Sequence, residues 1–210
     1  MMHCVIDHLV ITAPTLASGA DWVAHALGVA PGRGGAHPRM GTHNLLLRLG
    51  EAMFLEVLAP DPAAARPPRP RWFALDDLGP DDAPRLSAWV ARTDDLQACA
   101  GELLALLGPI ETMTRGAREW LITIPPDGSL PLGGALPMLI EWQSPRAPAG
   151  AGLPEAACEL AGLGLRHPQA ARLNELLALA GLADRVAIGT GMPGLWADIV
   201  TPSGQRRLGP

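Results

Sequence analysis

Hydrophobic and polar positions at the start of the chain predict a strand, a helix and then further strands. Residues 3–13, HCVIDHLVITA, are rich in β-branched side chains and are predicted to form a strand. Pro14 then opens a predicted helix through TLASGADWVAHALG, which ends at Gly28. The stretch 30–44 is rich in turn-forming residues, and LLLRLG and AMFLEVLA follow as two predicted strands joined by a tight turn.

The same order of elements begins again after the middle of the chain. RLSAWVART is a predicted strand, and DDLQACAGELLALLG is a predicted helix with Asp94 or Asp95 as its N-cap and Gly108 as its C-cap. IETMTR and REWLITI predict a hairpin around Gly116, and LPMLIEWQ is a final apolar strand. This recurrence is the strongest pattern in the sequence.

The recurrence predicts an α+β protein with two βαβββ modules, at about 3–60 and 85–145. The connector at 60–84 is too rich in proline for a strand or a helix. ACELAGLGL, PQAARLNELLALAG, RVAIG and LWADIVT predict a partial third module with the order βαββ. We therefore expect 1–150 to form a two-module domain and 151–210 to pack on it as a C-terminal partial module.

Composition and charge are those of a compact globular protein. The 210 residues are 48% hydrophobic and 18% charged, with a mean hydropathy of +0.17. The net charge of −5 leaves no basic surface for nucleic acid. Because no apolar run approaches the roughly 20 residues that span a bilayer, no membrane segment is expected.

The types of residue in the chain predict its cellular compartment and exclude several catalytic groups. The N-terminus has no signal-peptide pattern, and Cys4, Cys99 and Cys158 are scattered, which predicts reduced thiols in a cytoplasmic protein. Heavy use of Ala, Gly, Pro and Arg is typical of a GC-rich bacterial genome. The chain contains no lysine and no tyrosine, which excludes a Schiff-base lysine, a P-loop lysine and a tyrosine acid.

The strand AMFLEVLA raises a specific question, because Glu56 is its one charged residue and both of its faces look buried. A buried carboxylate without a partner costs several kcal/mol or takes up a proton. A metal, a histidine or an arginine such as Arg48, across the hairpin, could each be that partner. Glu141 occupies the matching place in the last strand of the second module.

Four segments of the chain carry a resemblance to a known group of proteins. IDHLVI, GGAHPRMGTHNLLLRLG, FLEVLAP and LPMLIEWQ together resemble the vicinal oxygen chelate superfamily, which includes glyoxalase I, extradiol dioxygenases and bleomycin-resistance proteins. The more particular similarity is to its glyoxalase-like domain branch. The resemblance implies that each βαβββ module curls into half a barrel and that the two halves enclose a cleft.

The resemblance also implies a divalent metal and three ligands for it, which would be His8, Glu56 and Glu141. Ser87 lies near the fourth ligand position, where glyoxalase I-like members have histidine. One imidazole and two carboxylates suit Mg²⁺ or Mn²⁺ best, with Fe²⁺, Ni²⁺ and Zn²⁺ as alternatives. His37 or His43 could supply a second nitrogen.

Two loops supply the candidate substrate-binding residues. The glycine-bounded loop before the predicted strand LLLRLG carries His37, His43 and Asn44, and the predicted hairpin around Gly116 carries Arg115, Arg118 and Trp120. Arginine can bind a substrate carboxylate with two parallel hydrogen bonds. The alternatives are an ordinary turn for the first group and an exposed charged turn for the second.

Three functions are compatible with these features. The first is a metal-dependent lyase, isomerase or dioxygenase for a small substrate with vicinal oxygens, with Glu141 or Glu56 as general base. The second is a metal-free protein of the bleomycin-resistance type that binds and sequesters a small molecule. The third is a role in assembly, in which the partial third module covers a barrel edge or forms a homodimer contact.

Overall fold

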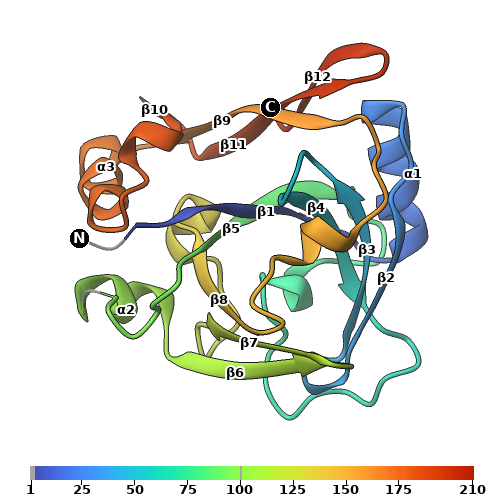
Figure 1. Cartoon of the computed structure of the whole chain (residues 1–210), viewed down its shortest axis with the longest axis horizontal. Coiled ribbons are helices and arrows are strands. Elements are labelled where there is room, and N and C mark those ends of the chain that lie inside the picture. The colour runs from blue at the N-terminus through green and yellow to red at the C-terminus, as the bar shows by residue number, and fades with distance from the viewer. Residues whose placement is uncertain (1–2, 100) are drawn as a thin grey trace.

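The computed structural model describes residues 3–99 and 101–210, so Met1, Met2 and Ala100 lie outside the described residues. These residues form an eight-stranded sheet, a four-stranded sheet and short helices (Figure 1). The eight strands follow the order β2-β3-β4-β1-β5-β8-β7-β6, and the four follow the order β10-β9-β11-β12. Among the described residues, no helix has the length and hydropathy needed to cross a membrane.

The first module has the predicted βαβββ order of elements. Its elements are β1 (Val5–Thr12), α1 (Leu16–Leu27), β2 (Gly32–His37), β3 (Thr42–Arg48) and β4 (Phe54–Pro60). Thr15 caps α1 at its start, and Gly28, at φ 73°, ends it in the left-handed conformation. The turn-rich stretch 30–44 contains β2, an edge strand paired with β3, which completes the βαβββ order expected for the module.

The second module repeats this order but has a shorter helix than predicted. Its elements are β5 (Arg85–Arg92), α2 (Gly101–Leu107), β6 (Ile110–Arg115), β7 (Arg118–Thr123) and β8 (Met138–Ser144). The predicted helix start at Asp94 or Asp95 was wrong: the Asp95 carboxylate closes a turn by accepting from the Ala98 amide instead. The hairpin around Gly116 is confirmed as β6 and β7.

The two modules join through their first strands, and this places the interior of the barrel between them. β1 runs antiparallel to β5, while each first strand runs parallel to the last strand of its own module, β1 to β4 and β5 to β8. Alternate residues of these strands face opposite sides. Leu9, Ile11 and Trp89 therefore belong to an outer core, whereas Val10 and Val90 belong to an inner one.

The C-terminal unit contains the predicted βαββ order and one further strand. Its elements are β9 (Glu159–His167), α3 (Ala170–Leu179), β10 (Ala187–Thr190), β11 (Gly194–Thr201) and β12 (Gly204–Leu208). Its first strand lies inside the sheet, between β10 and β11, so its strand order differs from that of the two modules.

This unit covers a face of the large sheet rather than a barrel edge. Figure 1 shows its sheet lying across β1 and β5. Its buried residues share the outer core with those two strands; from the unit these include Leu163, Leu165, Leu173, Ala197 and Ile199. Burial of this area holds the unit in place through the hydrophobic effect.

Candidate functional site

The two modules enclose a cavity with a polar side and an apolar side. Its polar lining groups are His8, His37, Asn44, Glu56 and Arg115. The free volume is about 30 Å³, which is enough for about two water molecules. Any larger ligand would have to part the walls, so the site suits a small molecule.

The partners of the buried Glu56 carboxylate are an amide and an imidazole. Its side chain, on β4, is almost fully buried. One carboxylate oxygen, Oε1, accepts from Asn44 Nδ2 at 2.5 Å, and the other, Oε2, lies 3.6 Å from His8 Nε2. Arg48 is not its partner, because the Arg48 guanidinium donates to the backbone carbonyls of Gly50 and Leu153.

Asn44, on β3, is held so that its NH₂ group points at Glu56. Its Oδ1 atom accepts from the Gly35 amide at 2.7 Å and from Arg115 Nη1 at 3.4 Å. A carbonyl oxygen is the only end of the amide that accepts, so these two donors determine its orientation. A Cβ at Gly34 would lie 2.0 Å from the same oxygen, so the close approach of β2 requires glycine there.

The Gly34→Ala variant is therefore expected to lose about 1–3 kcal/mol of unfolding free energy, because the added methyl group displaces Asn44 or bends β2. Urea denaturation followed by tryptophan fluorescence measures this change. Gly32→Ala is the matched control, since a Cβ at Gly32 meets only the Leu46 carbonyl at 3.8 Å. If the two variants unfold at the same urea concentration, the close approach of Gly34 to Asn44 is contradicted.

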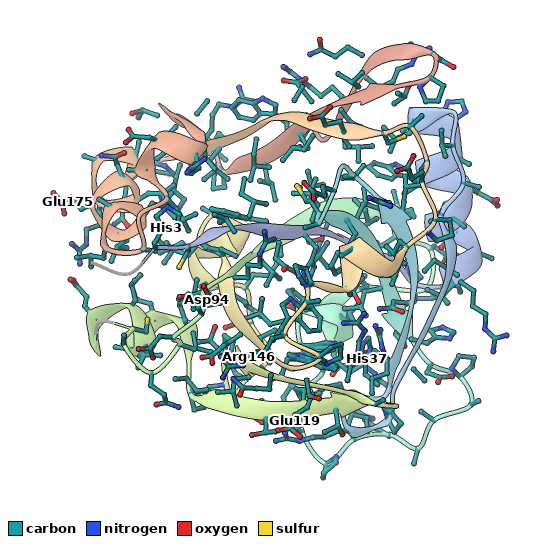
Figure 2. The ribbon with its side chains drawn as sticks, viewed as in Figure 1. His3, His37, Asp94, Glu119, Arg146 and Glu175 are labelled. Atoms are coloured by element: carbon teal, nitrogen blue, oxygen red, sulfur yellow. The ribbon has the colours of Figure 1, made fainter. Side chains whose placement is uncertain are left out.

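His37, at the end of β2, is a neutral acceptor in this network. Burial lowers its pKa to about 4, so it carries no charge at neutral pH. Its Nε2 atom lies 3.2 Å from Arg115 Nη1 and must accept, because a guanidinium only donates. Its Nδ1–H then donates to Thr42 Oγ1, which also accepts from the indole of Trp72. In Figure 2 the His37 side chain lies inside the fold, whereas Glu175 projects from its periphery.

Arg115 brings a positive charge into the cavity from the second module. It lies at the end of β6, and its contacts with His37 and Asn44 link that strand to the first module. Burial lowers its pKa, which is a measure of how far the guanidinium is removed from water. Among the residues that the structure describes, its hydrogen-bond partners are these two neutral side chains and no carboxylate.

Two neighbours, Phe54 and Asp7, hold His8 on β1. The contact with Asp7 was not predicted from the sequence. The His8 ring stacks on Phe54, with centroids 4.4 Å apart and an angle of 16° between the planes. Its Nδ1 atom lies 2.7 Å from Asp7 Oδ1. Strict alternation along the strand would place Asp7 on the opposite face. The available signal was an acid directly before the histidine in IDHLVI.

The rest of the cavity wall is apolar and comes largely from the second module. Trp120 lines it as predicted, together with further aromatic and aliphatic side chains from both modules: Phe54, Trp72, Ile122, Ile140 and Trp142. The Trp142 indole also donates to Asp7 Oδ2 at 3.0 Å, which links β8 to β1.

Glu141 does not join His8 and Glu56, contrary to expectation. Ile140 and Trp142 face the cavity, so alternation along β8 turns Glu141 to the other side of the sheet. There its carboxylate accepts from the Leu96 amide at 2.7 Å and from Gln143 Nε2 at 2.6 Å. Glu141 thus satisfies backbone near α2 rather than the cavity.

His43 and Arg118 also lie outside the cavity lining. His43 alternates with Asn44 on β3, and its Nδ1 atom is 3.9 Å from Asp61 Oδ1. Arg118 donates to the Ala147 carbonyl at 3.1 Å, and its Cζ atom lies over the Trp142 ring, 5.6 Å from the centroid. Of the expected substrate-binding residues, the structure therefore brings together His37, Asn44, Arg115 and Trp120.

The donor set does not fit the divalent metal that the resemblance implies. On the second module, Val90 pairs with His8 in register, and Ser87 hydrogen-bonds to Thr12 outside the cavity. Within residues 3–99 and 101–210, no three His, Cys, Asp or Glu side chains are grouped to hold one ion. His8 and Glu56 supply two of the three ligands that the resemblance implies, and the third, Glu141, lies on the other side of the sheet.

Two solved structures are similar to this chain at low sequence identity, and the first of them shows the fold. A hypothetical protein from Staphylococcus aureus is 12% identical, with a TM-score of 0.58 and coverage of 99% of this chain and 85% of that one. Methylmalonyl-CoA epimerase from Mycobacterium tuberculosis is 18% identical, with a TM-score of 0.42 and coverage of 64% and 84%. No functionally curated protein matches in sequence.

The family assignment rests on a match over most of the chain. The sequence profile described as "Glyoxalase-like domain" matches residues 6–181, which span both βαβββ modules and reach the end of α3. The paired modules and the cavity between them are the arrangement that the resemblance implied. The chain belongs to the glyoxalase-like domain family of the vicinal oxygen chelate superfamily.

Proposed function

We propose that the protein is an isomerase that moves a proton on a small, uncharged hydroxy-ketone or hydroxy-aldehyde without a metal ion. The observation that carries this proposal is the buried Glu56 carboxylate, which has one oxygen bound by Asn44 and the other facing the cavity beside His8. A carboxylate held in this way can act as general base toward a carbon-bound proton.

The charges around the cavity support an uncharged substrate. Glu56 is negative and Arg115 is positive, and the amide of Asn44 lies between them. His37 is neutral because burial lowers its pKa to about 4. An anionic ligand would add an unbalanced charge to a buried, largely apolar space, which is costly.

The total charge of the site and the substrate would stay the same throughout the reaction. Glu56 would take the proton from the carbon next to the carbonyl, and the negative charge would pass to the carbonyl oxygen of the substrate. Arg115, with its donors fixed in advance, would stabilise that oxygen. The carboxyl group would then return the proton to the carbon that carried the carbonyl, while the hydroxyl proton of the substrate passes to the former carbonyl oxygen, so that the isomerisation needs no co-reactant.

Proton NMR in D₂O tests the proposal directly. Hydroxyacetone and glyceraldehyde would be incubated with the purified full chain, and loss of the signal from the carbon-bound proton would report exchange. Propane-1,2-diol is the control compound, since it lacks the carbonyl that makes the proton acidic. The absence of exchange with every hydroxy-carbonyl compound tested would overturn the proposed activity.

A second function, metal-free sequestration of a small apolar compound, is favoured by the aromatic wall. Trp72, Trp120 and Trp142 line the cavity, so their fluorescence would change when a ligand fills it. Tight binding without deuterium exchange, equal in the native protein and the Glu56→Gln variant, would favour sequestration over isomerisation. Whether the protein forms the predicted homodimer would be determined separately, from its molecular mass in solution.

Removal of metal ions is expected to leave the protein unchanged, because His8 and Glu56 alone are too few ligands. Treatment with a chelator should shift neither Tm nor the rate of deuterium exchange. Adding Mg²⁺, Mn²⁺, Fe²⁺, Ni²⁺ or Zn²⁺ to the stripped protein should likewise leave Tm in place, since an ion that does not bind the native state cannot stabilise it. An increase in Tm that depends on ion concentration would restore the metal-dependent alternative.

A further inference from the structure

We propose that Asp7 is a positioning residue that keeps the proton of His8 on Nδ1 and leaves Nε2 bare toward Glu56 and the cavity. The inference rests on the proposed function for its consequences, but its central claim concerns the protonation pattern of one ring. It follows from three features of the structure: a β-bulge, a buried carboxylate and an indole from the opposite module.

The bulge explains how two consecutive strand residues come to face each other. Ile6 pairs with Ala91 and His8 pairs with Val90, so Asp7 is an extra residue on β1. A bulge interrupts the alternation of side chains and can turn a residue toward the face of its neighbour. The Asp7 carboxylate thereby reaches His8 Nδ1 at 2.7 Å.

The surroundings of Asp7 keep it an acceptor. Its side chain is fully buried, and its second oxygen, Oδ2, accepts from Trp142 Nε1 at 3.0 Å. The guanidinium of Arg92 lies 3.6 Å from the same oxygen and supplies a positive charge. An ionised carboxylate has no proton to give, so His8 Nδ1 must donate to it.

The tautomer that results creates a receptor for a hydroxyl group. With its proton on Nδ1, the neutral ring presents a lone pair at Nε2, 3.6 Å from the acceptor Oε2 of Glu56. Two acceptors that face each other favour a donor between them. A substrate hydroxyl meets this need: Nε2 takes its proton and returns it to the neighbouring oxygen, while Glu56 moves the proton between the carbons.

Trp142 makes this arrangement depend on both modules. Its ring is part of the cavity wall, and its Nε1–H is bound to Asp7 across the junction of β8 and β1. Stacking on Phe54 holds the plane of the His8 ring. Asp7, His8 and Trp142 thus form one unit with the cavity.

Nitrogen NMR of the full chain labelled at histidine tests the inference without any substrate. Long-range ¹H–¹⁵N correlation spectra distinguish a protonated ring nitrogen from a bare one, and His8→Gln identifies the His8 signals by their loss. We expect a proton on Nδ1 and none on Nε2 at neutral and mildly alkaline pH. A proton on Nε2 alone, or on both nitrogens, would overturn the inference.

Variants add a second test of the same claim. Asp7→Asn should shift the His8 proton partly or wholly to Nε2 and lower deuterium exchange by about 10²-fold or more. Asp61→Asn, which changes the acid near His43, should leave the His8 signals in place. An unchanged tautomer in Asp7→Asn would contradict the role of Asp7. The predicted tautomer in a protein that exchanges no substrate would instead refute the proposed function alone.

Discussion

The Glu56→Gln variant is expected to lose deuterium exchange by about 10²- to 10⁴-fold, the usual contribution of a general base. Glutamine has the shape of glutamate, and its amide can still pair with Asn44. It cannot accept a proton from carbon at neutral pH. The measurement is the initial rate of exchange by proton NMR, with ligand binding followed in parallel by tryptophan fluorescence.

The matched control for this variant is Glu141→Gln, the acid at the corresponding place of the second module. Its carboxylate accepts hydrogen bonds from the Leu96 amide and from Gln143 Nε2, on the side of the sheet away from the cavity. This variant should exchange substrate at nearly the native rate, with a small loss of stability from the weakened bond to the Leu96 amide. Equal losses in both variants would contradict the assignment of the base to Glu56.

The Trp89→Ala variant is expected to lose about 3–5 kcal/mol of unfolding free energy. Trp89 is fully buried on β5, opposite Leu9 of β1, in the core that the large sheet shares with the C-terminal unit. Its indole also donates to the Ala135 carbonyl at 3.1 Å. The truncation would leave a cavity between the two sheets and an unpaired carbonyl, a large loss for a protein of ordinary stability.

Urea denaturation measures this loss, and two variants set its scale. Trp22→Ala removes a half-buried tryptophan from α1 and should cost clearly less. Trp89→Phe keeps most of the volume and should lie between the native protein and Trp89→Ala. If Trp89→Ala unfolds at the same urea concentration as Trp22→Ala, the two sheets do not share a tightly packed core.

Local patterns predicted most of the secondary structure, because capping residues and periodicity act over short distances. Pro14 and Gly28 marked the limits of α1, and Gly116 marked the β6–β7 hairpin. The pattern did not locate β2 within the turn-rich stretch, because the pairing with β3 overrides the low strand preference of glycine. It also placed the start of α2 too early, since the Leu96 amide is bound by a side chain from β8.

The candidate site was less predictable, because its composition depends on which face of each strand turns inward. The repeat correctly directed attention to His8 and Glu56, yet it treated Glu141 as equivalent to Glu56. The facing of β8 separates the two acids, with Ile140 and Trp142 on the inside and Glu141 on the outside. The β-bulge at Asp7 interrupts the alternation of side chains along β1. It brings Asp7 to the side of His8, although strict alternation would place it on the opposite face.

The sequence by itself determined the order of the elements, the duplication of the βαβββ unit and the presence of a buried acid in the last strand of the first module. These follow from periodicity, turn residues and composition, which are local properties of the chain. Only the tertiary structure decided that Asn44, Arg115 and the Asp7–His8 pair surround that acid, and that the last strands form a separate sheet over the first two modules. The physical reason is that strand facing and sheet order depend on the pairing of distant segments, whose energies no short stretch of residues contains.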